Sequence, residues 1–382
     1  MHIRKLDTAQ KRERARFVDF AFDLYKGHPL WVPPLRNDAM NLMDRAKHPY
    51  YEHSDADFFV VEEGERVLGR VAMLENRSYN TFHNRKAAFF GYFEVVEEIE
   101  AARLLLRQAV DWAKGRGLDT LIGPRGLVGI DGSVLVEGFE HRPALTIPYN
   151  YPYYDAFIKD SGFEKDTDYL SGYARGDHEL PPRLYEIAAK VKEKRGFWIK
   201  TFASRGEIRE WIPRAMAVHR EAMSSLHSFY PPTENETRAV VNSLLTIIDP
   251  SLIKLVMKGD EIAGFIIAYH DVSAGLQKAK GRLFPFGWFH VLRDRRVTDW
   301  VNVNGLGLLP QYRGLGANAM LYTELRDTIN SHNFKHIDVV QVNEANFNSR
   351  SDMETMGITW YKRHRHYKLT LQHVFGGKLP AA

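Results

Sequence analysis

The stretch Val301-Asn302-Val303-Asn304-Gly305-Leu306-Gly307-Leu308-Leu309-Pro310-Gln311-Tyr312-Arg313-Gly314-Leu315-Gly316-Ala317 decides the fold. An apolar strand ends at Pro310, a turn with two glycines follows, and a helix begins at once. Such a turn directs backbone N–H groups and the positive end of the helix toward one point, which favours a pyrophosphate. Glycine permits close approach to the phosphates, and Arg313 adds a positive charge. By itself, a Gly-x-Gly after a strand is equally typical of an ordinary strand–helix unit.

The order of the segments around this turn favours the phosphate-binding interpretation. Apolar periodicity predicts strands at 252–257, 262–269, 300–309 and 337–342 and helices at 315–330 and 349–356. Asn343-Glu344-Ala345-Asn346 follows the fourth of these strands, and Met356-Gly357-Ile358 leads into a last strand that ends near residue 369. In this order and spacing the sequence resembles the GCN5-related N-acetyltransferase (GNAT) superfamily over about residues 252–369. The matching signature positions are Gln311, Gly314, Gly316, Asn346 and Gly357-Ile358.

The resemblance implies acetyl-CoA or another acyl-CoA as the donor. It implies that backbone N–H groups of residues 313–317 hold the pyrophosphate and that the main chain of 306–308 pairs with pantetheine. Asn346 is implied to lie beside the cofactor arm, and the two central strands to splay apart around the thioester. The cofactor-binding residues implied in this way are Leu306, Gly307, Leu308, Gln311, Arg313, Gly314, Leu315, Gly316, Ala317 and Asn346.

The usual proton handlers of the superfamily are missing from the matching positions. Met353 stands where a tyrosine commonly protonates the leaving thiolate, and methionine has no proton to donate. Asn302 and Asn304 lie on the strand where a glutamate is often found. The substitutes that we consider are Tyr361, Tyr367, Glu354 and Asp299, and no catalytic residue is assigned. The reaction can tolerate the loss of a general acid, because a thiolate leaves readily and binding in line supplies much of the acceleration.

The first half of the chain repeats the order of segments seen in the second. We therefore expect an α/β fold with two tandem GNAT-like domains, residues 1–176 and 177–382, each a mixed, partly splayed sheet flanked by helices. The whole chain also resembles a bacterial family of tandem acetyltransferase-like proteins, through segments such as Trp31-Val32-Pro33-Pro34 and Pro148-Tyr149-Asn150-Tyr151-Pro152. In the first half, Glu94-Val95-Val96-Glu97-Glu98-Ile99-Glu100 replaces the phosphate loop, and its carboxylates would repel a pyrophosphate. We interpret this domain as a degenerate copy.

An apolar segment followed by basic residues occupies positions 283–296, between two strands of the second half. Three interpretations remain open at this point. The segment could form a lid over a hydrophobic acceptor, rest on a membrane surface, or pack between the domains with a solvated basic end.

Composition excludes several classes of function. The chain of 382 residues has no cysteine, so disulfides, thiolate metal sites and a cysteinyl thioester intermediate are excluded. The histidines lack metal-ligand spacing, and we predict no metal site. A net charge of +4 without a dense basic stripe argues against nucleic acid. No signal peptide or membrane-spanning run is recognised, so we expect a cytoplasmic protein. The oligomeric state is left open.

The expected function is transfer of an acetyl or other acyl group from acyl-CoA to an amine, in a direct ternary complex. The acceptor is expected to be a small-molecule or peptide amine. Two alternatives stay open: an acyl-CoA-binding sensor without turnover, and a long-chain N-acyltransferase that makes a lipid amide.

Overall fold

Contacts between residues divide the chain into two units. The computed structural model describes residues 1–127, 132–226 and 228–371. The first unit contains residues 1–169, 273–292 and the described residues from 362 onward, and the second contains 170–272 and 293–361. Two long strands, β7 (Glu164–Arg175) and β13 (Thr359–Thr370), contribute to both units. The expected domain division between residues 176 and 177 stays a prediction.

The first unit is a mixed sheet in the order β1-β2-β3-β4-β5-β13, with β6 also pairing with β13. Only the β4–β5 pair among the registers described here is parallel. The strands are β1 (His2–Lys5), β2 (Asp55–Glu63), β3 (Arg66–Glu75), β4 (Ala87–Val95), β5 (Thr120–Gly123) and β6 (Val134–Glu137). The helices are α1 (Lys11–Leu24), α2 (Arg36–Leu42), α3 (Arg77–His83), α4 (Ile99–Gly115), α5 (Tyr153–Asp160) and α9 (Ser273–Lys278).

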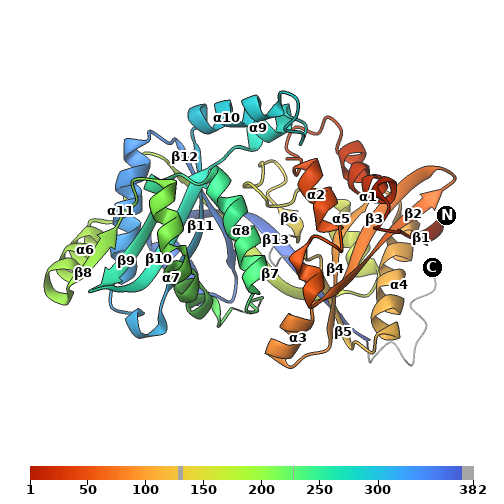
Figure 1. Ribbon diagram of the computed structural model, residues 1–382, viewed down its shortest axis with the longest axis horizontal. Helices are drawn as coiled ribbons and strands as arrows, with labels where there is room; N and C mark the ends of the chain where they lie inside the picture. Colours follow the sequence, from red (N-terminus) through yellow and green to blue (C-terminus); the bar gives the residue numbers. More distant parts are fainter. Residues whose placement is uncertain (128–131, 227, 372–382) are drawn as a thin grey trace. The chain divides into compact units, whose positions relative to one another are not determined.

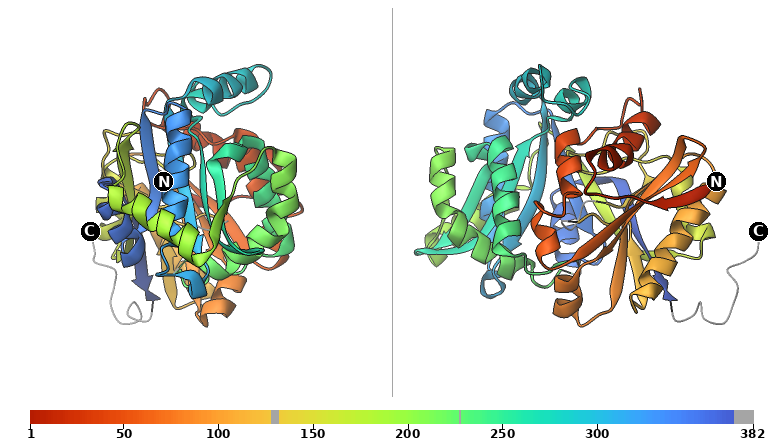
Figure 2. Two further views of the ribbon diagram at one scale, coloured as in Figure 1. Left: turned by 90° about the vertical axis from the view of Figure 1, so that its left-hand side faces the viewer. Right: turned by 45° about the vertical axis from the view of Figure 1, so that its right-hand side comes forward.

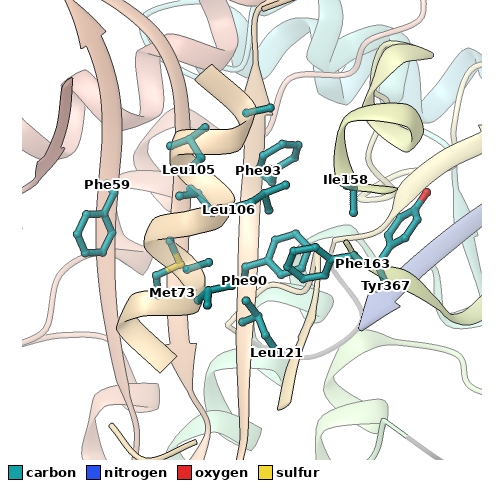
Figure 3. Packing of buried hydrophobic residues seen from close by; sticks show 14 of the residues in the cluster. Phe59, Met73, Phe90, Phe93, Leu105, Leu106, Leu121, Ile158, Phe163 and Tyr367 are labelled. Carbon is teal, nitrogen blue, oxygen red and sulfur yellow. The ribbon is translucent and has the colours of Figure 1, made fainter. Parts of the chain in front are cut away.

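The core of the first unit forms between α4 and the sheet. Apolar residues of α4 recur at helical spacing and are buried, among them Leu105 and Leu106. Figure 3 shows them facing Phe90 and Phe93 of β4, with Phe163 close to Phe90. The rings of Phe90 and Phe163 lie edge to face with centroids 5.3 Å apart.

The second unit is a mixed sheet in the order β7-β12-β11-β10-β9-β8. Its strands are β8 (Phe197–Lys200), β9 (Ile253–Lys258), β10 (Glu261–His270), β11 (Trp300–Leu308) and β12 (His336–Asn343). Its helices are α6 (Pro182–Arg195), α7 (Arg205–Met223), α8 (Glu234–Ile247), α11 (Ala317–Ser331) and α12 (Phe347–Thr355). Helix α10 (Gly287–Val297) starts in residues of the first unit and ends in residues of the second.

Helices cover both faces of the second sheet (Figures 1 and 2). Helices α6 and α11 bury one face, through a core that includes Val301, Leu321 and Leu325. Helices α7 and α8 cover part of the other face, over Leu255 and Phe265. Both units are therefore α/β layers of the predicted kind, and the predicted strands and helices of 252–369 are all present with small shifts at their ends.

Truncating Phe90 is expected to destabilise the first unit strongly. Its side chain is fully buried, so Phe90→Ala should lower the free energy of unfolding by about 3–5 kcal/mol through lost burial and a cavity. Urea denaturation followed by circular dichroism measures this. Phe82→Ala, at a ring that is 45% exposed, is the matched control and should change stability by less than about 0.5 kcal/mol. Equal losses in both variants would contradict the assigned core.

Candidate cofactor site

The central strands of the second unit part where the site is expected. Strand β11 pairs in parallel with β12 from Trp300–His336 to Val303–Val339, and no further. Yet β11 continues to Leu308 beside β10, and β12 continues to Asn343. The register between β10 and β11 shifts at the same level, and Gly305 has φ +113°, a conformation open to glycine. The predicted splay is confirmed.

The turn after β11 leaves backbone donors without partners. A short 3-10 turn (Pro310–Tyr312) follows β11, Gly314 and Gly316 have φ +73° and +83°, and α11 begins at Ala317. Within the part of the chain that the structure describes, the N–H groups of residues 314–317 donate to no protein acceptor. No side chain of the described residues caps α11. Four free donors at the positive end of a 15-residue helix fit an anion such as a pyrophosphate.

The two glycines of the turn have different surroundings. A Cβ at Gly314 would meet nothing within 4 Å, so the space over this residue is open. A Cβ at Gly316 would lie 2.9 Å from Ile187 and 3.0 Å from Val191, both on α6. Gly314 therefore keeps a surface clear, whereas Gly316 lets the turn pack against a helix.

The side chains of Arg313 and Gln311 do not extend into the open space. The Arg313 guanidinium donates to the carbonyl oxygens of Leu308 (3.2 Å) and Ala222 (3.0 Å). Its backbone N–H donates to Pro310, so the expected use of this amide is not supported by the geometry. Gln311 contacts Glu261 of β10 at 3.5 Å. In this structure Arg313 fixes the turn against β11 and α7 rather than offering its charge to a ligand.

Asn346 and residues 306–308 border the parted strands. Asn346 caps α12, because its side-chain oxygen accepts from the Ser349 N–H at 3.3 Å. Leu306 is half-buried, and Gly307 and Leu308 are buried. A Cβ at Gly307 would lie 2.8 Å from Met223 and from Phe265, so this glycine is required by packing.

The position expected to hold a general acid is filled by core packing. Met353 is buried in the same apolar cluster as Val339 and Met356. Its neighbour Asp352 accepts from Asn318 (2.8 Å) and Tyr322 (3.0 Å), which ties α12 to α11. Burial and the Asp352 carboxylate raise the pKa of Tyr322 well above the usual tyrosine value.

A buried polar cluster lies on β10, β11, β12 and β13 beside the point where the strands part. The Tyr361 hydroxyl donates to Asp338 at 2.7 Å, and Asp338 is in register with Asn302. On β11 and β10, the Asn304 side chain donates to the Tyr269 hydroxyl at 3.2 Å. Asp338 and Asn302 are almost fully buried. Val301 and Val339, which are next to Asn302 and Asp338 in the sequence, belong to the core between the sheet and helices α6 and α11. Because side chains alternate between the two faces of a sheet, the polar cluster lies on the other face of this sheet.

The cluster raises the pKa of its tyrosines. Burial, and then the Asp338 carboxylate, raises the pKa of Tyr361 far above its usual value. Burial also raises the pKa of Tyr269. Both hydroxyls are therefore protonated at neutral pH and act as hydrogen-bond donors or acceptors rather than as phenolates. Sequence reasoning named Tyr361 and the two asparagines but missed Asp338, although an aspartate within the apolar run 337–340 was a signal.

The other substitutes for proton handling lie elsewhere. Tyr367 is buried in the core of the first unit, where its hydroxyl donates to Asp155. Glu354 accepts from the Trp360 ring N–H at 3.1 Å and is exposed. The Asp299 carboxylate lies 3.9 Å from Lys335, at a half-buried position. None of the three belongs to the cluster around Asp338.

The first unit repeats the parting of strands but fills it with its own chain. Strand β4 pairs with β5 only from residue 87 to 89, although it continues to Val95. The backbone of Arg125 lies in the gap: its N–H donates to Phe90, and a Cβ at Gly91 would be 2.0 Å from its carbonyl oxygen. Glu94 is half-buried and paired with Arg70 at 2.8 Å. This geometry supports the degenerate interpretation of the first domain, which stays a prediction.

Over residues 1–127, 132–226 and 228–371, no three His, Asp or Glu side chains come together as a metal site would need. Over the same residues, no helix has the length and apolar character of a bilayer span.

Comparison with solved structures identifies the fold. A tandem GNAT protein from the clavulanic acid biosynthesis pathway matches over 97% of this chain and 98% of its own, with TM-score 0.57 and 12% identity. The chain has the tandem GNAT fold. A glucosamine N-acetyltransferase region of a fungal multi-domain β-N-acetylglucosaminidase matches 96% of this chain and 38% of its own, with TM-score 0.52 and 12% identity.

Two curated proteins are similar to this chain over nearly its full length. Protein YghO of Escherichia coli K12 is 24% identical over 94% of this chain and 93% of its own. A protein of Caulobacter vibrioides named bacterial ceramide synthase is 25% identical over 94% of this chain and 95% of its own. No protein-family model matches the chain.

Alanine at the two turn glycines is expected to separate their roles. Both substitutions force alanine into the left-handed region, at a cost of about 1–2 kcal/mol. Gly316→Ala should cost about 1–3 kcal/mol more, because the new methyl group also collides with α6. Urea denaturation of the two variants measures the difference. Equal stabilities would contradict the close packing of Gly316 on Ile187 and Val191.

Proposed function

We propose that this tandem GNAT protein transfers an acyl group from acyl-CoA to a primary amine through a direct ternary complex. The observation that carries the proposal is the set of free N–H groups of residues 314–317 beside the parted strands β11 and β12. An anion bound at the turn would lie at the same end of the sheet as the unpaired main-chain edge of β11, and this supports the proposed donor site.

The proposed donor site uses main chain more than side chains. The N–H groups of 314–317 would hold the pyrophosphate of CoA, and the main chain of 306–308 would pair with the pantetheine arm. Acyl-CoA, when bound, supplies an electrophilic acyl carbon and a good leaving group, the CoA thiolate. Asn346, at the start of α12, borders the opposite side of the opening. Arg313, held on Leu308 and Ala222, keeps the turn in its binding shape.

The polar cluster is the proposed proton acceptor. As the amine nitrogen bonds to the acyl carbon and the carbon–sulfur bond breaks, the amine must lose a proton. We assign this proton to the Asp338 carboxylate, which the Tyr361 hydroxyl orients at 2.7 Å. The Asn304–Tyr269 pair would hold the acceptor at the edge of the opening. The thiolate leaves and takes a proton from solvent.

We further propose a long-chain amine as the acceptor, so that the product is a lipid amide. Two observations favour this class over a small polar amine. Large apolar side chains are exposed at residues 284–297. An enzyme for a small polar amine has no need of such an apolar surface, whereas an enzyme for a lipid amine does. The relative from Caulobacter vibrioides carries the name bacterial ceramide synthase, and a ceramide is an amide of a long-chain base.

A glutamate at Gly314 is expected to abolish binding of acyl-CoA. Its side chain enters the open space over the turn and brings a negative charge to the pyrophosphate position. Gly259→Glu is the matched control, because Gly259 has φ +57°, also has nothing within 4 Å of a Cβ, and lies in the β9–β10 turn. Isothermal titration with acetyl-CoA and palmitoyl-CoA should show wild-type affinity in the control and a loss of at least about 100-fold in Gly314→Glu. Unchanged affinity in Gly314→Glu would contradict the assignment of the turn.

Removal of the proposed proton acceptor is expected to slow turnover without weakening donor binding. Asp338→Asn should lower kcat roughly 100-fold or more and leave the Kd for acyl-CoA unchanged. Tyr361→Phe should cause a smaller loss, and Asp260→Asn, at an exposed turn, should cause none. Release of free CoA with sphinganine or octylamine as acceptor provides the measurement.

The same assay tests the sensor alternative. Wild-type protein could bind acyl-CoA tightly and yet release no CoA with any of a panel of short and long amines. That result would show an acyl-CoA-binding protein and contradict the proposal of an enzyme. Full activity of Asp338→Asn would leave the enzyme standing and remove Asp338 from the mechanism.

A further inference from the structure

Exposed aromatic side chains are concentrated in one short stretch of the chain. Among the described residues, twelve large hydrophobic side chains are exposed, and six of them lie between residues 284 and 297. Phe284 and Phe286 are 80% and 74% exposed. The others are Trp288, Phe289, Leu292 and Val297. The interpretation of this segment as buried packing is therefore wrong, and the apolar surface needs another explanation.

The exposed face of α10 combines these apolar side chains with positive charge. Trp288, Phe289, Leu292, Arg293, Arg296 and Val297 are all exposed and recur at helical spacing on one side of the helix. The acidic residue of α10, Asp294, and Arg295 lie on the other side and are half-buried. Arg295 donates there to the Ile248 carbonyl at 3.0 Å. The outward face of the helix thus carries aromatic and cationic groups and no carboxylate.

More positive charge precedes the aromatic residues. Lys278, Lys280 and Arg282 are exposed, and no acidic residue occurs between them and Trp288. We call residues 278–297 the aromatic–basic segment. Large rings beside Lys and Arg are the composition of protein surfaces that insert into the interface of a bilayer with anionic lipids.

The base of the segment is held firmly within the first unit. The Gln277 side chain donates to the carbonyls of Pro29 (2.8 Å) and Trp31 (3.0 Å). The Arg36 N–H donates to Gly281 at 2.9 Å, and a Cβ at Gly281 would lie 2.4 Å from the Pro34 carbonyl. The exposed rings are therefore presented from a fixed support, which lowers the entropic cost of binding a surface.

We propose that the aromatic–basic segment docks the protein on the surface of a bilayer that contains anionic lipids. Phe284, Phe286, Trp288 and Phe289 enter the headgroup region, and Arg293 and Arg296 contact lipid phosphates. The proposal deepens the proposed function, because a lipid amine resides in such a bilayer, and rests on it for the identity of the acceptor. Docking itself needs neither acyl-CoA nor turnover.

Vesicle flotation tests the docking directly. Wild-type protein should float with phosphatidylcholine vesicles that contain about 30% phosphatidylglycerol, and weakly or not at all with phosphatidylcholine alone. Raising the salt from about 0.1 M to about 0.5 M should reduce the bound fraction, because the arginine contacts are screened. Phe284→Ser combined with Phe286→Ser and Phe289→Ser, and separately Arg293→Gln with Arg296→Gln, should each weaken binding at least about tenfold. Phe82→Ser, an exposed ring on α3, is the control and should bind as wild type.

Tryptophan quenching locates the contact. Vesicles with brominated phosphatidylcholine should quench part of the tryptophan fluorescence of the wild type, and that part should vanish in Trp288→Phe. Binding by wild type and the triple serine variant alike would overturn the proposal, as would no binding to anionic vesicles. A concentration-dependent dimer that the triple variant abolishes, without vesicle binding, would show instead that a second copy of the chain covers the segment.

The outcome is separable from that of the proposed function. Vesicle binding together with absent acyl-CoA binding would keep the docking surface and refute the acyltransferase. If both the docking and the proposed acyltransferase activity are correct, the triple serine variant should turn over octylamine in solution at the wild-type rate. It should lose at least about tenfold in turnover of sphinganine presented in anionic vesicles. Equal loss on both acceptors would overturn a docking role.

Discussion

The end of pairing between β11 and β12 after Val303 and Val339 is the constraint on which the donor site depends. Two parallel strands that stay in contact would satisfy each other's N–H and C=O groups and leave nothing to bind. Here the strands separate while β11 remains attached to β10, and Gly305 absorbs the change of direction. The free edge of β11 then leads within a few residues to the turn at Gly314 and Gly316. A main-chain binding site therefore follows from one interruption in the sheet.

In both units two parallel strands stop pairing before they end, but the gap between them is filled differently. In the first, the Arg125 backbone occupies the gap, Gly91 admits it, and Glu94 is neutralised by Arg70. In the second, Gly314 leaves open space, and the N–H groups of residues 314–317 have no acceptor among the described residues. A duplicated fold thus offers one copy closed by its own chain and one copy open at the corresponding place. The structural likeness to a tandem GNAT protein over nearly the full chain agrees with a duplicated fold.

Local signals explain how much could be predicted from the sequence. Strands β9 to β12 and helices α11 and α12 follow from apolar periodicity. The positive φ values of Gly314 and Gly316 follow from the need for glycine in a tight strand–helix turn. Because the order of segments is characteristic, the splayed sheet could be predicted as well. These features depend on residues close together in the chain, where propensity and periodicity carry the information.

Features that depend on tertiary contacts could not be predicted. The charge of Arg313 was expected to serve the ligand, but carbonyl groups of Leu308 and Ala222 hold it. Tyr367 and Tyr361 are on one strand, yet the contacts of the chain assign them to different units. The exposure of Phe284 and Phe286 contradicts the usual burial of aromatic residues, and only the fold reveals it. Asp338 acquires its importance from Tyr361, which comes from another strand.

Hydrogen–deuterium exchange with and without saturating palmitoyl-CoA tests the central claim most directly. The free N–H groups of residues 314–317 should exchange fast in the protein alone and become strongly protected when the ligand binds. Peptides that cover 304–308 should be protected as well, and those that cover Glu94–Glu100 of the first unit should not change. Protection confined to the first unit, or unchanged exchange at 304–317 under conditions where the ligand is bound, would contradict a donor site built on the parting of β11 and β12.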